Sequence, residues 1–251
     1  MTGGTRPQVR VFPDPEALSR AAAEFFTAIS NKSIASRGRF VVALSGGSTP
    51  RRLYALLGSP PYQNDVDWKQ VHIFWADERC VPQYHAESNF KLAVDTLLSR
   101  VAIPQENIHR IKGEDGPERA AEEYERDIRS FFGPASLPVF DLIILGAGED
   151  GHTASLFPGS PALRETTRLA APVHLELPKP GRVTLTLPVL NHAVRTLFLA
   201  AGHAKAGVVH AILVNGNPLH YPAGLVQPVR GGVIWFVDKQ AAGLLTTQGH
   251  T

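Results

Sequence analysis

The 251-residue chain has one cysteine, Cys80, so it can form no intrachain disulfide and cannot hold a cysteine-rich metal site. No apolar run approaches the roughly 18 residues that a membrane-spanning helix needs. The segment from Met1 to Pro7 is polar and contains glycine, and no apolar signal-peptide core follows it. We therefore expect a cytoplasmic protein that has no membrane partner.

Charge of one sign is also in little excess. The formal net charge is +2, and basic and acidic residues are interspersed along the chain without a long run of either sign. A nucleic-acid-binding protein usually concentrates its lysine and arginine on one stretch. The sequence therefore predicts no nucleic-acid partner, while the small positive excess is compatible with a small anionic ligand.

Linkers, internal repeats and low-complexity segments are missing as well. The 22 glycines and 20 prolines lie between apolar runs, where turns are expected, and do not form tracts. The length is sufficient for one large α/β domain or two small ones. Because nothing divides the chain, we expect residues 1–251 to form a single α/β domain.

Apolar runs typical of strands alternate with stretches that have a helical apolar stripe. Strands are predicted at 9–12, 40–44, 71–75, 140–145, 183–187, 196–200 and 233–237, and helices are predicted after Pro15, Pro50, Ser88, Pro117, Gly202 and Asp238. This alternation predicts an α/β fold with a mostly parallel sheet flanked by helices, in a Rossmann-like three-layer architecture.

Polar clusters follow three of the predicted strands directly, at 45–49, 77–79 and 146–152. In an open parallel sheet, ligands bind outside the carboxyl ends of the strands. The three clusters are therefore expected to meet in one site.

The segment Ser45, Gly46, Gly47, Ser48 and Thr49 connects a strand to a helix. Glycines let backbone N–H groups approach a ligand closely, and a helix N-terminus carries partial positive charge, so the segment could bind a phosphate. A tight turn capped by Ser48 or Thr49 explains the same residues equally well. It is not a Walker loop, because the Gly-Lys-Ser/Thr ending is missing.

The run from Gly146 to Gly151 matches the dinucleotide pattern G-x-G-x-x-G, but Glu149 and Asp150 would repel a pyrophosphate there. No G-x-S-x-G turn is present, Cys80 has no evident adjacent base, and no histidine pair has metal-ligand spacing. The sequence therefore predicts no cofactor and no metal, and it disfavours covalent catalysis.

His152 lies two residues after Asp150 on this glycine-containing turn. A carboxylate can orient an imidazole and raise its basicity, which suits proton transfer at neutral pH. The alternative is a surface or helix-capping histidine.

Three cations are candidate ligand contacts. Arg79 follows a buried strand and could clamp a phosphate, or form a salt bridge with Asp77 or Glu78. Lys205 lies near a helix N-terminus, where a cation is unfavourable unless an anion is bound. Arg182 precedes a strand and could be a ligand contact or a solvated surface residue.

Together these motifs resemble those of the 6-phosphogluconolactonases, a family related to the glucosamine-6-phosphate deaminases. The resemblance is carried, in order, by 44–50, Asp77-Glu78-Arg79, Ser88-Asn89, 146–158, 182–186, 202–205 and 235–239. The deaminases typically have Asp-Glu-Tyr where this chain has Asp77-Glu78-Arg79.

The resemblance implies hydrolysis of 6-phospho-D-glucono-1,5-lactone to 6-phosphogluconate, the second step of the oxidative pentose phosphate pathway. It implies that His152 is the base, that Arg79 and Lys205 lie near the anionic end of the substrate, and that 45–49 and Arg182 contact the ligand. Loop amides from Gly148 to Gly151, or a nearby cation, would stabilise the oxyanion. The oligomeric state stays open, with a monomer as one option.

Two other functions are considered. A sugar-phosphate isomerase or deaminase would use the same phosphate contacts, with Asp77 moving a proton between adjacent carbons. A non-catalytic sugar-phosphate sensor usually carries a DNA-binding or partner domain, and no helix-turn-helix candidate is left over here.

Overall fold

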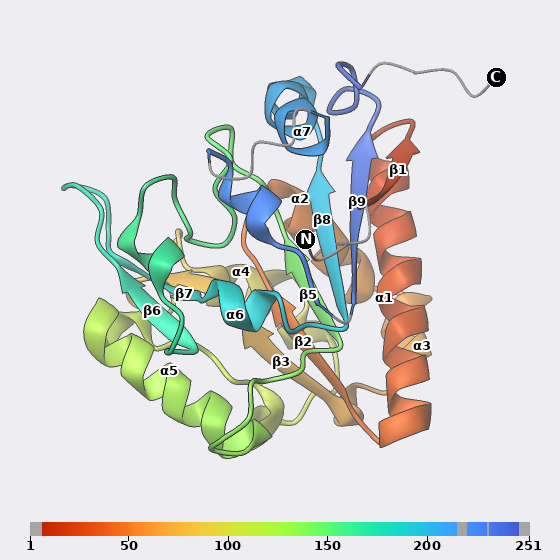
Figure 1. Cartoon of the computed structure of the whole chain (residues 1–251). Coiled ribbons are helices and arrows are strands. Elements are labelled where there is room, and N and C mark those ends of the chain that lie inside the picture. Colours follow the sequence, from red (N-terminus) through yellow and green to blue (C-terminus); the bar gives the residue numbers. More distant parts are fainter. Residues whose placement is uncertain (1–6, 215–219, 230, 246–251) are drawn as a thin grey trace.

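Six parallel strands form the main sheet of the structure, a computed structural model that describes residues 7–214, 220–229 and 231–245 (Figure 1). From one edge to the other they are β1 (Gln8–Phe12), β9 (Gly232–Asp238), β8 (Arg195–Ala200), β5 (Leu142–Leu145), β2 (Phe40–Leu44) and β3 (Val71–Trp75). Every pairing within this sheet is parallel. The predicted α/β class and parallel sheet are therefore confirmed.

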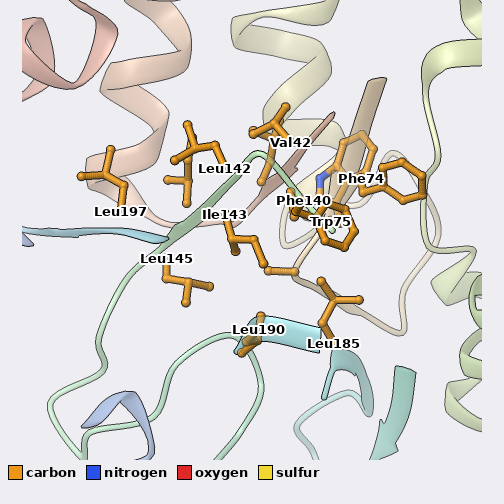
Figure 2. Packing of buried hydrophobic residues seen from close by; sticks show 14 of the residues in the cluster. Val42, Phe74, Trp75, Phe140, Leu142, Ile143, Leu145, Leu185, Leu190 and Leu197 are labelled. Carbon is orange, nitrogen blue, oxygen red and sulfur yellow. The ribbon is translucent and has the colours of Figure 1, made fainter. Parts of the chain in front are cut away.

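The adjacent strands β5 and β2, both inside the sheet, are buried along their whole length. A strand covered on both faces has no side chain in water, which is why each is a continuous apolar run and not an alternating one. In Figure 2, Leu142 and Leu197 point to one side of the sheet, whereas Ile143 and Leu145 point to the other. The core thus has two apolar layers, one on each face of the sheet.

Helices cover the face of the main sheet to which Leu142 and Leu197 point. They are α1 (Pro15–Arg37), α2 (Ser48–Leu57), the single-turn α3 (Tyr62–Asp65) and α4 (Asn89–Thr96). The longest, α1, begins where the Asp14 carboxylate accepts the N–H of Ala17 at 2.8 Å, and it ends at Gly38 with a left-handed φ of 72°. An N-cap aspartate, a first-turn proline and a C-terminal glycine are the sequence features that set these limits.

A second, antiparallel sheet contributes to the other layer. It consists of β4 (Asp77–Arg79), β7 (Arg182–Leu185) and β6 (Ala170–Val173), and α5 (Pro117–Phe132) packs on it. Leu185 of this sheet and Leu190 of α6 (Leu187–Leu190) lie beneath Ile143 and Leu145 (Figure 2). This layer is therefore mixed, whereas the sequence predicted helices alone.

The remaining elements are short. The helix α7 (Ala206–Leu213) follows β8, and single 3₁₀ turns lie at Trp68–Gln70, Leu98–Arg100, Gln105–Asn107, Gly113–Asp115, Pro161–Arg164, His203–Lys205 and Pro222–Leu225. No described helix combines the length and apolar character needed to span a bilayer.

Three predicted elements differ from the structure, and the first is the strand predicted at 140–145, which begins at Leu142. The strand predicted at 183–187 ends at Leu185, because the proline-containing turn of α6 begins at Leu187, and it pairs in the antiparallel sheet. The helix predicted after Asp238 is wrong for the part of the chain that is described, since residues 239–245 form only turns. There the Asp238 carboxylate accepts the N–H of Ala241 at 2.7 Å, and that bond closes a turn.

The strand order creates a switch point between β2 and β5. From β2 the chain passes to β3 on one side, while β5 lies on the other side of β2. Connections that diverge from adjacent strands leave a crevice at their carboxyl ends. The fold therefore places the segments 45–49 and 146–152 at the two sides of that crevice.

Candidate active site

A pocket of about 210 Å³ opens at the switch point, at the carboxyl ends of the main-sheet strands. Its lining residues are Ser45, Gly46, Gly47, Ser48, Thr49, Pro50, Asp77, Arg79, Asn89, Gly146, Ala147, Gly148, His152, Ala154, Arg182, Leu199 and Lys205. The structure thus brings together every predicted site residue except two. Asp150 and Gly151 are not lining residues, but Asp150 is hydrogen-bonded to the lining residue His152.

The glycine-containing segment after β2 leads into the N-terminus of α2. Gly47, the N-cap residue, has a φ of 113°, which favours glycine, and no side chain caps the helix. The helix N-terminus therefore faces the pocket with its partial positive charge uncovered. Ser45 has a structural role. Its hydroxyl donates to the Ile144 carbonyl at 2.8 Å, its N–H donates to the Tyr54 hydroxyl, and that hydroxyl donates to the Ser45 carbonyl.

The imidazole of His152 is held by Asp150. Nδ1 of His152 lies 2.6 Å from Oδ1 of Asp150, and the His152 backbone N–H donates to the same oxygen at 3.1 Å. Partial burial raises the pKa of Asp150, but the hydrogen bonds from His152 and the charge of its ring outweigh burial and hold that pKa below its ordinary value. With Nδ1 occupied, Nε2 is the nitrogen left to exchange a proton in the pocket.

The loop around this histidine closes on itself. The N–H of Gly148 donates to the His152 carbonyl at 2.8 Å, and the N–H of Gly151 donates to the Gly148 carbonyl at 2.9 Å. Both N–H groups are therefore occupied in this structure, whereas the sequence suggested them as oxyanion donors. Gly151 has a φ of 83°, and a β-carbon there would lie 2.5 Å from Cδ1 of Tyr221.

Arg79 and Arg182 face each other across the β4–β7 ladder. The Nε–H groups of both guanidinium groups are buried and have no partner among the described residues. Burial, followed by the charge of Arg79, lowers the pKa of Arg182, while Asp77, whose Oδ2 is 3.9 Å from Nη1, opposes this shift. Like charges opposite each other are destabilising, so the pair is suited to an anion.

Lys205 lines the same pocket, at the end of the 3₁₀ turn that precedes α7. Gly202, at the start of this turn, donates its N–H to both carboxylate oxygens of the buried Asp238, at 3.0 and 3.1 Å. The position of Lys205 thus depends on the last residue of β9.

The sequence did not assign a role to Asn89, and it suggested Asp77 only as a salt-bridge partner of Arg79 or as the proton-transfer group of the isomerase alternative. Both are buried lining residues, and Oδ2 of Asp77 accepts the hydroxyl proton of Ser155 at 2.6 Å. Their one sequence signal is their presence in the segments that carry the family resemblance. Among the described residues, no three His, Cys, Asp or Glu side chains are grouped so as to hold a metal ion.

Known proteins resemble the chain along nearly its whole length. Residues 13–235 match the family model described as glucosamine-6-phosphate isomerases/6-phosphogluconolactonase. A Homo sapiens protein named 6-phosphogluconolactonase is 42% identical over 95% of this chain and 93% of its own length. An Arabidopsis thaliana protein named probable 6-phosphogluconolactonase 1 is 40% identical, over 96% and 94%. A solved structure of 6-phosphogluconolactonase from Trypanosoma brucei matches with a TM-score of 0.85 and 31% identity, over 96% of this chain and 99% of that one.

Proposed function

Because the chain belongs to the glucosamine-6-phosphate isomerase/6-phosphogluconolactonase family, we propose that it hydrolyses 6-phosphogluconolactone to 6-phosphogluconate, the second step of the oxidative pentose phosphate pathway. The observation that carries this proposal is an imidazole held by a carboxylate in the same pocket as three cations and an uncapped helix N-terminus. Hydrolysis of a phosphorylated lactone needs a base that activates water, which the imidazole supplies, and positive charge that binds the phosphate, which the cations and the helix N-terminus supply.

In this proposal His152 is the general base. Its Nε2 takes a proton from water as the water oxygen attacks the lactone carbonyl carbon, which gives a tetrahedral oxyanion. When the carbonyl reforms, the bond from that carbon to the ring oxygen breaks, and the imidazolium returns the proton to that oxygen. Asp150 keeps Nδ1 protonated and stabilises the imidazolium. General-base catalysis of this kind contributes about 10²–10⁴-fold.

The segment from Ser45 to Thr49, together with Arg79 and Lys205, binds the phosphate. The N-terminus of α2 adds the attraction of its helix dipole. Binding energy from this non-reacting group holds the lactone carbonyl in register with His152.

Arg182 supports the oxyanion. Its guanidinium carbon lies 5.6 Å from the centroid of the Phe157 ring, and the His152 ring packs against the same phenyl group at 4.6 Å. Since the N–H groups of Gly148 and Gly151 are occupied, a cation beside the histidine is the better source of charge stabilisation.

The isomerase or deaminase alternative is not favoured. It requires Asp77 to exchange a proton with substrate carbon, but each oxygen of this carboxylate already accepts a hydrogen bond, from Asn89 at 3.2 Å and from Ser155 at 2.6 Å. Ammonia release from glucosamine-6-phosphate would be the sign of that activity. The non-catalytic sensor is disfavoured because the paired histidine and carboxylate have no purpose in it.

The test is acid release from freshly prepared 6-phosphogluconolactone, measured against its spontaneous opening. The wild type is expected to accelerate opening, and His152→Ala to retain its fold and substrate binding while losing most of the acceleration. Near-wild-type turnover of His152→Ala would remove the histidine from the mechanism.

Lys205→Ala should mainly lower kcat/KM for the phosphorylated lactone, and an equal effect on unphosphorylated gluconolactone would contradict phosphate binding by Lys205.

The same proposal includes a cytoplasmic location and a small molecule as the partner. The single cysteine and the anionic substrate both fit a reducing compartment rich in sugar phosphates. Some plant relatives are named chloroplastic, so cell fractionation is the appropriate measurement.

A further inference from the structure

Asn89 is fixed in the pocket wall by two consecutive acidic residues. Its backbone N–H donates to Oε1 of Glu78 at 2.8 Å, and the next N–H, that of Phe90, donates to Oε2 at 2.7 Å. The Glu78 carboxylate thereby binds the N-terminus of α4, where negative charge is favourable. The Asn89 side chain in turn contacts Asp77, and only 2% of the residue is exposed.

The hydrogen bonds to Asp77 determine which way the Asn89 amide points. Nδ2 of Asn89 donates to the Asp77 carbonyl at 2.9 Å and to Oδ1 of the Asp77 carboxylate at 3.2 Å. Both hydrogens of the amide nitrogen are used in this way. A flipped amide would place its oxygen against two acceptors, so Oδ1 must point away from Asp77.

Oδ1 of Asn89 is left as a buried acceptor that has no donor among the described residues. It faces the backbone of Gly46, where a β-carbon would overlap it. A buried polar atom without a partner destabilises the folded protein, because it has lost its hydrogen bonds to water and gained none. This cost falls on a residue that lines the pocket, beside Asp77, Arg79 and Arg182. Such an atom is expected where a ligand supplies the missing partner.

We infer that Oδ1 of Asn89 accepts a hydrogen bond from a ring hydroxyl of the lactone and so makes Asn89 a specificity-determining residue. This inference rests on the proposed function. An amide oxygen is only an acceptor, and phosphate oxygens are acceptors too, so the partner must be a group that carries a hydrogen. Between its phosphate and its carbonyl, the proposed substrate offers only hydroxyl groups of this kind. Because Gly46 covers Oδ1, the inference requires the segment of Gly46 and Gly47 to move outward when the ligand binds, and two glycines give the backbone freedom for such a movement.

The test is a cycle that combines protein and substrate changes. We propose to measure kcat/KM of the wild type and of Asn89→Ala for 6-phosphogluconolactone and for its 2-deoxy, 3-deoxy and 4-deoxy analogues. One analogue should be about 3- to 10-fold poorer for the wild type, as expected for loss of one neutral hydrogen bond. The kcat/KM of Asn89→Ala for the natural substrate should fall by a similar factor. For this variant, kcat/KM should be the same for the natural substrate and for that analogue. If both proteins lose the same factor with every analogue, the inference is wrong.

Asn107→Ala is the matched control. Asn107 is also buried, and its amide donates to the Lys69 carbonyl at 3.0 Å, but it does not line the pocket. This variant should retain the analogue preference of the wild type.

If Asn89→Ala does not fold, a crystal structure of the wild type with 6-phosphogluconate decides the question. A ligand hydroxyl within about 3.2 Å of Oδ1 supports the inference, and a water or no partner there overturns it. A wild type that does not accelerate lactone opening would instead refute the proposed function.

Discussion

Gly148 and His152 are packed so closely that residue 148 cannot carry a side chain in this conformation. A β-carbon there would overlap Nδ1 and Cε1 of the imidazole and lie 2.6 Å from Oδ1 of Asp150. The glycine is thus required by the histidine–carboxylate pair, and the two occupied N–H groups of the loop hold the same geometry. Gly148 therefore makes room for the imidazole, whereas Gly151 makes room for Tyr221.

The first prediction is that Gly148→Ala lowers kcat by about 10²-fold, the effect expected when a catalytic group is displaced by about 1 Å. KM should change little, because the phosphate contacts lie on other segments. Initial rates of lactone opening measure both quantities. Gly207→Ala is the control, since a β-carbon on this glycine of α7 would have nothing within 4 Å. A Gly148→Ala enzyme with the kcat of the wild type would show that the loop adapts without cost.

The second prediction concerns the opposed arginines. Arg79→Gln removes one of two like charges that face each other, so the ligand-free protein should unfold at a temperature no lower than that of the wild type. The same change should weaken binding of 6-phosphogluconate about 10- to 100-fold, because charge-assisted hydrogen bonds are lost. Thermal unfolding with and without 6-phosphogluconate measures both effects. A lower melting temperature with unchanged ligand stabilisation would mean that Arg79 is purely structural.

The features of the fold and site that the sequence predicted correctly are those that leave a pattern in one short segment. The buried strand 40–44, the capped start of α1 at Asp14 and the glycine loop before His152 are all local patterns, and the structure agrees with them. The antiparallel sheet was not predicted, because β4 and β6 have only three and four residues and their pairing with β7 is not local. Asn89 was missed for a similar reason. Its partners, Asp77 and Gly46, are brought to it only by the fold.

The third prediction is that Asp238→Asn selectively impairs use of the phosphorylated lactone. Oδ1 of Asp238 accepts the N–H groups of both Gly202 and Ala241, and Oδ2 also accepts the N–H of Gly202 at 3.1 Å, so an amide whose oxygen keeps the Oδ1 contacts directs its own N–H at the N–H of Gly202. The turn that carries Lys205 should therefore shift. KM for 6-phosphogluconolactone should rise about 3- to 10-fold, as for one lost hydrogen bond, while kinetics with unphosphorylated gluconolactone stay close to those of the wild type.

The neighbouring exposed residue supplies the control for Asp238→Asn. Lys239→Ala should leave the kinetics with both lactones unchanged, because within the described part of the chain Lys239 makes a hydrogen bond only through its backbone N–H, which donates to the Phe12 carbonyl at 2.8 Å. If Asp238→Asn reduced turnover of both lactones by the same factor, Asp238 would support the fold in general and not the position of Lys205.

The last prediction concerns stability in acid, far from the pocket. Burial, followed by the charges of His109 and Arg39, lowers the pKa of His72 from 6.5 to about 4. Its Nδ1 is buried without a partner in the described part of the chain, and its ring packs on Phe131 with centroids 4.7 Å apart. The folded protein therefore keeps His72 neutral at a pH where the unfolded chain protonates it.

The sign of the effect follows from proton binding. Between pH 6.5 and about 4 the unfolded state binds more protons at His72, so the free energy of unfolding falls as the pH is lowered through this range. His72→Phe removes the titrating group and keeps an aromatic ring against Phe131. Urea unfolding at several pH values should show that this variant loses less stability on acidification than the wild type does. His220→Gln, at an exposed position, should follow the wild-type curve. Parallel curves for the wild type and His72→Phe would mean that protonation of His72 does not contribute to acid unfolding.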